Sequence, residues 1–224
     1  IAPLLQETTK KLCEQKLSNY YYIPTQHSSE FTCDNDRIFF GGISYKKQVA
    51  SFQNLIDEPV TLISDSSNIT SGIDAHVRKQ YEVATFLHLE QVRNLKYIFN
   101  ANKEHLHDKV LFLNLPPVSA SLFLTQLRLY DITPKRIYAT QILYTPHLFQ
   151  LTQEKDREMM VIANSIQPLD KQITGYGKLL QNNLRYEWID FTTAYGLQQF
   201  LQNTQTSQFD YTITHTKANK RNFT

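Results

Sequence analysis

Short apolar runs alternate along the chain with longer segments in which apolar residues recur every three or four positions. The short runs predict strands, and the periodic segments predict amphipathic helices. The clearest strand is Val110-Leu-Phe-Leu-Asn-Leu115, which is apolar at nearly every position and therefore suited to burial on both faces. The predicted strands are residues 20–23, 38–40, 60–63, 82–88, 110–115, 135–141, 159–163, 186–189 and 211–214. The predicted helices are residues 3–17, 44–56, 90–101, 119–130, 151–157 and 192–203.

The pattern is most regular between residues 37 and 64. Arg37-Ile-Phe-Phe-Gly-Gly-Ile-Ser44 is an apolar run that breaks at two glycines and a helix-capping serine. An amphipathic helix then leads to a second run, Glu58-Pro-Val-Thr-Leu-Ile-Ser64. Strand, turn, helix and strand in this order predict two neighbouring parallel strands joined by a right-handed crossover. The sequence therefore predicts an α/β fold with parallel sheets.

Two segments allow a second interpretation. Residues 77–99 also satisfy one long helical period, which competes with the strand at 82–88 and the helix at 90–101. Tyr20-Tyr-Tyr22 alternates faces along its strand. If helices cover both faces of the sheet, these rings pack in the core, whereas exposed tyrosines mark a protein-binding surface.

Composition excludes several classes of partner. The chain has 224 residues, a net charge of +2, 41% hydrophobic residues and 20% charged residues, which fits a globular protein with one large core or two small ones. Lysine and arginine are scattered, so no nucleic-acid partner is expected. No apolar run approaches the roughly 20 residues that a membrane-spanning helix needs. We therefore expect no membrane span in the mature chain.

The two cysteines, Cys13 and Cys33, are too few for a zinc cage and too far apart in sequence for a Cys-x-x-Cys redox pair. Cys13 lies on the inner face of the first predicted helix, and Cys33 lies in a polar loop at residues 24–36. One possibility is a bridge that pins the loop to the helix and stabilises the fold by roughly 3 kcal/mol. The other is a pair of unlinked thiols, with Cys13 buried as a small apolar residue.

Catalytic and metal-binding motifs have little support in the sequence. The chain has no Gly-x-Ser-x-Gly elbow, His-Glu-x-x-His helix or phosphate-binding P-loop. Gly41-Gly42 is only a fragment of a dinucleotide loop, because the third glycine is missing. Glu104, His105 and His107 offer metal-ligand types, but in a polar turn between a helix and a strand. We expect no enzymatic activity, no cofactor and no metal.

Four segments together carry a resemblance to a known family. Residues 36–44 and residues 58–70, with a helix between them, resemble the first lobe of type I periplasmic binding proteins. Residues 110–140 and Ala194-Tyr-Gly-Leu-Gln-Gln-Phe-Leu201 resemble segments of the rest of that fold. The resemblance implies two Rossmann-like lobes with parallel sheets and a cleft between them. It places the first lobe at residues 1–75, the second at 76–190, and a helix and strand that cross back at 191–224.

The sequence also departs from the family pattern. Tyr45 replaces the second serine of the turn, Asp65 stands where proline is usual, and Asn68 stands where threonine is usual. The resemblance therefore does not predict an α-amino-acid ligand. Only about ten residues separate Thr70 from Tyr81, where the family has further strands and helices. We expect either a chain break at residues 72–80 or a strongly reduced second lobe.

The resemblance implies a location, a disulfide and a set of site residues. The location is the periplasm or cell envelope, an oxidising compartment in which Cys13 and Cys33 should be bridged. Hydroxyls and helix amides from three loops would line the ligand cleft. The predicted cleft residues are Gly41, Gly42, Ser44, Ser64, Ser66, Ser67, Asn68, Pro117 and Ser119.

Two functions fit this resemblance. The first is a non-enzymatic envelope protein that binds another envelope protein, as the lipoprotein activators of cell-wall synthases do with the same fold. The alternative is a periplasmic receptor that binds a small polar solute in the cleft. The altered ligand loops and the short second lobe favour the first hypothesis.

Overall fold

The structure is a computed structural model that describes residues 6–30, 32–90, 95–167, 171–179, 181–201, 208–209 and 211–218. The chain forms two compact units, and each is built from segments that are distant in sequence. The smaller unit contains residues 1–44 and 165–212, and the larger unit contains residues 45–164 and 213–224. These boundaries differ from the expected divisions after residues 75 and 190, because the strand and helix that follow residue 59 belong to the larger unit.

The larger unit contains a six-stranded sheet with the order β4-β3-β5-β6-β7-β8. The strands are β3 (Val60–Ser64), β4 (Val83–His88), β5 (Val110–Asn114), β6 (Arg136–Ala139), β7 (Met160–Asn164) and β8 (Thr214–Lys217). The strands β3 to β7 are parallel to their neighbours, and β8 is antiparallel to β7. The central strands β3 and β5 are buried at every position, as continuous apolar runs in a parallel sheet should be.

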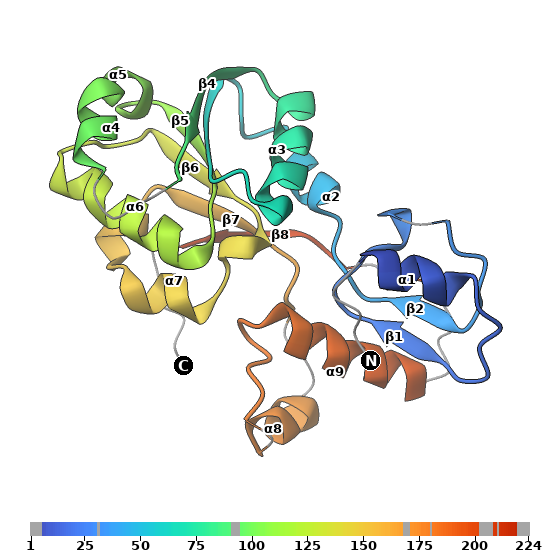
Figure 1. Cartoon of the computed structure of the whole chain (residues 1–224). Coiled ribbons are helices and arrows are strands. Elements are labelled where there is room, and N and C mark those ends of the chain that lie inside the picture. The colour runs from blue at the N-terminus through green and yellow to red at the C-terminus, as the bar shows by residue number, and fades with distance from the viewer. Residues whose placement is uncertain are drawn as a thin grey trace. The chain divides into compact units, whose positions relative to one another are not determined.

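Helices cover both faces of this sheet (Figure 1). The helices α2 (Tyr45–Ala50) and α3 (Asn68–Gln80) lie on one face, and α4 (Lys96–Ala101), α6 (Pro117–Leu129) and α7 (Pro146–Leu151) lie on the other. The short helix α5 (Lys103–Leu106) and the 3₁₀ turns η2 (Gln141–Leu143) and η3 (Glu154–Arg157) complete the unit. The ring of Phe52 packs 4.9 Å from that of Tyr138 on the first face, and Phe99 packs 5.4 Å from Phe123 elsewhere in the core.

The smaller unit is organised around a two-stranded parallel sheet of β1 (Tyr21–Ile23) and β2 (Ile38–Phe40). Its other elements are α1 (Gln6–Cys13), the 3₁₀ turn η1 (Ser28–Glu30), α8 (Lys171–Leu179) and α9 (Trp188–Leu201). The core residues Ile23, Ile38 and Phe40 pack against Cys13 and Cys33. These cysteines form a disulfide with Cα atoms 5.3 Å apart. The bridge therefore ties α1 to the polar loop that precedes β2.

A hydrogen-bonded cluster of tyrosines joins the two sequence segments of the smaller unit. The hydroxyl of Tyr22 lies 2.6 Å from Thr192 Oγ1, which lies 2.6 Å from the hydroxyl of Tyr211 and donates to the carbonyl oxygen of Gly41 at 2.9 Å. Burial is the largest influence on both phenols and raises the pKa of Tyr22 and Tyr211. The half-buried Tyr22 thus packs inside its own unit, whereas Tyr20 is 52% exposed.

The prediction that residues 37–64 form two neighbouring parallel strands was wrong. The strand β2 pairs with β1 in the smaller unit, and β3 lies between β4 and β5 in the larger unit. The helix between them therefore belongs to the larger unit rather than forming a crossover within one sheet. It is also shorter than predicted, because residues 51–55 continue as turns.

Neither a chain break nor a loop occupies residues 72–80, because α3 runs continuously through this segment. Ile73 and Val77, four positions apart, are both buried against the sheet. The larger unit retains its six strands, whereas the described part of the smaller unit has a sheet of only two. A strongly reduced second lobe was predicted, but the larger unit, which contains most of residues 76–190, is not the reduced one.

The structure decides two further predictions. The alternative long helix at residues 77–99 is excluded, because Val83–His88 is a strand. No strand forms at residues 186–189, where α9 begins. On α6, Leu124 and Leu127 are buried, whereas Leu122 and Leu129 are 40% and 72% exposed. In the described part of the chain, no helix is long and apolar enough to cross a membrane.

Removal of the disulfide should destabilise the smaller unit. The double substitution Cys13→Ser, Cys33→Ser releases the loop between the cysteines and should lower the free energy of unfolding by about 3 kcal/mol. Urea unfolding followed by fluorescence of Trp188, the chain's single tryptophan, measures this change because the indole lies in the same unit and donates to the Pro24 carbonyl oxygen. Dithiothreitol should destabilise the wild-type protein and leave the double variant unchanged. Equal stability of the oxidised and reduced wild-type protein would contradict this role.

Candidate functional site

Polar residues follow one another across the carboxyl edge of the six-stranded sheet. Ser64 at the end of β3 pairs in register with His88 on β4 and with Asn114 on β5. The register of β5 and β6, in which Phe112 pairs with Tyr138, brings Thr140 to the same level two residues later. Ser64, Asn114 and Thr140 are buried. Because parallel strands all end at one edge, the sheet collects these side chains in a row.

Asn114 connects this edge to the first turns of α3. Its Nδ2 donates to the carbonyl oxygen of Thr70 at 2.8 Å and to Oδ1 of Asp74 at 2.6 Å. Both carboxamide protons are therefore used within the protein. The buried Oδ1 of Asn114 and the buried Oγ1 of Thr140 accept or donate no hydrogen bond in the described part of the chain. The edge thus contains two polar atoms with unused hydrogen-bonding capacity.

The loop between β3 and α3 is held by its own side chains. Oδ1 of Asp65 accepts from Thr70 Oγ1 at 2.6 Å and from the Ser67 amide at 3.1 Å. The Ser66 amide donates to Ser64 Oγ at 3.1 Å, and Ser66 has a positive φ of 53°. Such a left-handed residue is uncommon outside glycine and marks a tightly turned loop. These contacts fix the direction in which α3 begins.

Exposed polar groups surround this helix start. Ser66, Ser67, Asn68 and His88 are exposed, and Ser66 Oγ lies 3.1 Å from Nδ1 of His88. The first amides of a helix have no partner within the helix, so its N-terminus attracts acceptors and carries partial positive charge. The carboxylate of Asp65 lies at the same place and offsets that charge. The arrangement therefore suits a hydroxyl, amide or amine better than a second carboxylate.

The structure brings one part of the predicted ligand set together. Ser64 ends β3, and Ser66, Ser67 and Asn68 lead into α3. Pro117 and Ser119 lie in the first turn of α6, after the neighbouring strand. Gly41, Gly42 and Ser44 belong to the smaller unit, in which Ser44 is the last residue before α2. The predicted set is thus divided between the two units.

The two glycines of the predicted turn contact the chain itself. A Cβ at Gly41 would overlap the side chains of Tyr22 and Thr192, and one at Gly42 would overlap the backbone of Gln26. The amide of Gly42 donates to the Gln26 carbonyl oxygen at 2.8 Å. Close packing therefore accounts for both glycines without a ligand.

Three polar residues at this edge were missed by the sequence analysis. Asn114, Thr140 and His88 each lie at the end of a predicted strand or just after its apolar core. A polar residue at the carboxyl end of an otherwise apolar strand was the available signal, because such ends meet at one edge of a parallel sheet.

The histidines considered as metal ligands have separate partners. His105 Nδ1 lies 3.3 Å from Thr85 Oγ1, and its Nε2 lies 3.5 Å from Oε1 of Glu104. His107 Nδ1 accepts from the Thr133 amide at 3.2 Å. Among the described residues, no three histidine, cysteine, aspartate or glutamate side chains form a group that could hold a metal ion.

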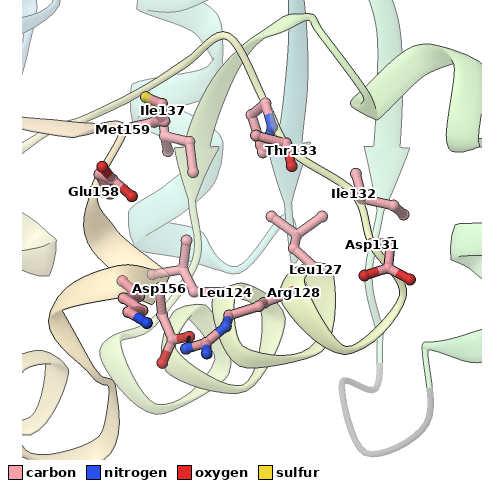
Figure 2. A pocket seen from close by; sticks show the side chains of 12 residues that line it. Leu124, Leu127, Arg128, Asp131, Ile132, Thr133, Ile137, Asp156, Glu158 and Met159 are labelled. Atoms are coloured by element: carbon pink, nitrogen blue, oxygen red, sulfur yellow. Dashed lines mark hydrogen bonds and ion pairs between the residues drawn. The ribbon is translucent and has the colours of Figure 1, made fainter.

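A pocket of about 250 Å³ lies at the opposite, amino edge of the sheet. Figure 2 shows Arg128 of α6 beside Asp156, and Leu124 and Leu127 of the same helix facing Met159 across the pocket. Arg128 Nη1 lies 3.4 Å from Asp156 Oδ1 and 3.1 Å from Gln153 Oε1. The guanidinium is therefore already paired, and the volume is below the roughly 300 Å³ typical of small-molecule sites.

Known structures share this fold. A branched-chain amino acid transporter protein of Thermus thermophilus with bound valine superimposes with a TM-score of 0.66 at 13% identity, covering 90% of this chain and 58% of that one. The branched-chain amino acid substrate-binding protein of Streptococcus pneumoniae in complex with isoleucine gives a TM-score of 0.63 at 13% identity, with 82% and 56% covered. A leucine-binding protein of Thermotoga maritima gives 0.61 at 12% identity, with 81% and 55% covered. No protein-family model matches the sequence, and neither does any curated protein.

The chain therefore has the fold of type I periplasmic binding proteins. The resemblance stated from the sequence is confirmed at the level of the α/β fold with mostly parallel sheets. The chain spans a little over half the length of these structural neighbours, 55% to 58%. The TM-scores of 0.61 to 0.66 establish the fold, and an identity of 12% to 13% leaves the ligand open.

Substitution of Gly41 tests whether its turn is filled by the protein. Gly41→Ala should lower the free energy of unfolding by about 1 to 3 kcal/mol, because the new methyl group displaces Tyr22 and Thr192. Gly175→Ala is the matched control, since Gly175 lies in α8 of the same unit and no atom lies within 4 Å of the position that its added methyl group would take. The control should be neutral or stabilising by up to about 1 kcal/mol. Urea unfolding measures both variants, and a Gly41→Ala variant as stable as the control would show that the turn has open space.

Proposed function

We propose that this protein is a non-enzymatic receptor of the cell envelope that binds a small polar solute at the carboxyl edge of its six-stranded sheet. The observation that carries the proposal is the group of exposed polar residues around the start of α3, namely Ser66, Ser67, Asn68 and His88. In open α/β sheets, ligands bind outside the carboxyl ends of the strands. A receptor for a small polar solute, the alternative expected from the sequence, is thus better supported than a protein that binds another envelope protein.

The structural neighbours support this class of function. They include a substrate-binding protein with isoleucine, a transporter protein with valine and an extracellular ligand-binding receptor of Rhodopseudomonas palustris. A periplasmic or extracellular location also agrees with the disulfide between Cys13 and Cys33, because disulfides persist in oxidising compartments.

The charge at the edge indicates the chemistry of the solute. Asp65 contributes a carboxylate next to the N-terminus of α3, where a ligand carboxylate would otherwise be favoured. Like charges in proximity repel, so a ligand carboxylate loses part of that attraction. We therefore propose a solute that presents hydroxyl, amide or amine groups to this edge rather than an α-carboxylate.

Binding of another envelope protein is the second candidate function. Val118, Leu122 and Leu129 are 51%, 40% and 72% exposed on α6. Their spacing of four and seven residues places them along one side of the helix. An exposed apolar row of this kind is a feature of protein interaction surfaces. It lies on a different element from the polar residues around α3, so the two functions are separable by substitution.

Calorimetric titration with a matched panel tests the solute proposal. The panel contains L-isoleucine, its amide, the corresponding amine without the carboxyl group, and an uncharged polyol. We expect at least one uncharged or cationic member to bind more tightly than isoleucine. Asn68→Ala should weaken that binding by about threefold to tenfold, because one hydrogen bond to the ligand is lost.

Two further variants make the test specific. Asp65→Asn should improve binding of isoleucine relative to its amide, because the repulsive carboxylate is removed. Asn100→Ala, at an exposed asparagine of α4, is the matched control and should leave all affinities unchanged. Binding that Asn68→Ala and Asn100→Ala affect equally would remove the carboxyl edge as the site, and the absence of any binding would remove the proposed solute class.

A further inference from the structure

A larger pocket of about 560 Å³ lies over the same sheet, at a different place from the carboxyl edge. It is built on one face of three adjacent strands, because Tyr138 of β6 pairs in register with Val161 of β7, which pairs with Lys217 of β8. Arg136, Met159 and His215 lie two residues before these positions and therefore share their face. Leu55, in the turns after α2, forms another part of the wall.

The floor of this pocket is apolar and its polar atoms are already bound. The Tyr138 hydroxyl donates to the Leu55 carbonyl oxygen at 3.0 Å. The imidazole of His215 stacks on Phe52 with centroids 4.9 Å apart and lies 2.9 Å from Ser51 Oγ. Partial burial lowers the pKa of His215. A volume of 560 Å³ falls within the roughly 300 to 1,000 Å³ of small-molecule sites.

The charged residues of the lining carry net positive charge. Arg136 and Lys217 are both exposed cations, and among the described residues neither lies within ion-pair distance of a carboxylate. The Arg136 guanidinium instead contacts Sδ of Met159, at 3.4 Å. Glu158 contributes the single lining carboxylate, so two cations oppose one anion. A guanidinium without a carboxylate partner beside an apolar floor is suited to an organic anion.

We propose that this pocket binds a small organic monoanion with an apolar or aromatic body, of the arylalkanoic acid type. The hydrocarbon part lies on Tyr138, Val161 and Met159, and the carboxylate meets Arg136 and Lys217. The smaller pocket of Figure 2 shares Glu158 and Met159 with this one but has its arginine paired to Asp156. The proposed site is separate from the carboxyl edge and does not rest on the function proposed for it.

The chain provides a direct probe of this pocket. Its only two methionines, Met159 and Met160, both line the pocket. The methyl spectrum of protein labelled with ¹³C-methyl methionine therefore contains two signals. The signal of Met159 reports on this site, because Met159 shares the pocket's face of β7, whereas the side chain of Met160 lies on the opposite face. Titration with sodium 4-phenylbutyrate should shift at least one of them in a saturable way, since the phenyl ring is placed beside the sulfur. The neutral 4-phenylbutyramide should bind about tenfold more weakly, because it lacks the charge that Arg136 and Lys217 recognise.

Substitutions of the cations complete the test. Arg136→Gln and Lys217→Gln should each weaken binding of 4-phenylbutyrate by about threefold to tenfold and reduce its advantage over the amide. Lys109→Gln is the matched control, because Lys109 is an exposed lysine of the same unit outside the pocket lining. The proposal fails if neither methionine signal shifts, if acid and amide bind equally, or if Lys217→Gln behaves like Lys109→Gln.

Discussion

The carboxamide of Asn114 is the interaction on which the candidate site depends. It joins the end of β5 to two points of α3, the carbonyl oxygen of Thr70 and the carboxylate of Asp74. All three residues are buried, so loss of the amide would leave a carboxylate and a carbonyl group without their donor. A hydrogen bond to a charged group contributes about 1.5 to 3 kcal/mol, and an unpaired buried group costs a similar amount. This constraint fixes where α3 begins and hence where its exposed polar residues lie.

The parallel sheet explains why a few polar residues are sufficient to form the edge of the candidate site. Strands β3 and β5 are buried at every position, which locks their register through packing on both faces. Each strand then ends at the same edge, so Ser64, Asn114 and Thr140 meet although they are far apart in sequence. The opposite ends of β6 and β7 supply Arg136 and the methionines of the second pocket, and the antiparallel β8 supplies Lys217. One sheet therefore presents two chemically different surfaces, one rich in hydroxyl and amide groups and one cationic with an apolar floor.

The sequence predicted β3, β5, β6 and β7 well, because their burial requires continuous apolar runs. The last strand was predicted at residues 211–214, but β8 is Thr214–Lys217 and is mostly exposed. It missed α3, since Asn68-Ile-Thr-Ser-Gly-Ile-Asp74 contains residues of low helix propensity and resembles a loop. Its N-cap Ser67 makes no side-chain capping hydrogen bond, so the helix start relies on Asp65 and Asn114, both outside the helix. The pattern of apolar and polar residues within the helix does not reveal such tertiary contacts. The pairing of β2 with β1, rather than with β3, is likewise a long-range choice that periodicity does not encode.

The sequence predicted only those residues of the candidate site that are close to one another along the chain. Ser64 to Asn68 could be assigned from a polar run that follows an apolar strand, and the structure places these residues at the edge of the sheet. Gly41 and Gly42 suggested a ligand turn, yet glycines at close contacts between chain segments give the same pattern. Asn114 acts through a partner 40 residues away, which only the fold reveals.

Hydrogen exchange of the Asn114→Leu variant tests whether this carboxamide positions α3. Leucine has a similar volume and lacks both amide donors. Backbone amides in the first two turns of α3 should exchange about tenfold faster or more, because roughly 1.4 kcal/mol or more of local stability is lost. Amides of β6 and β7 should keep their protection. Unchanged exchange in α3, measured by mass spectrometry on the intact fold, would show that the helix start does not depend on Asn114.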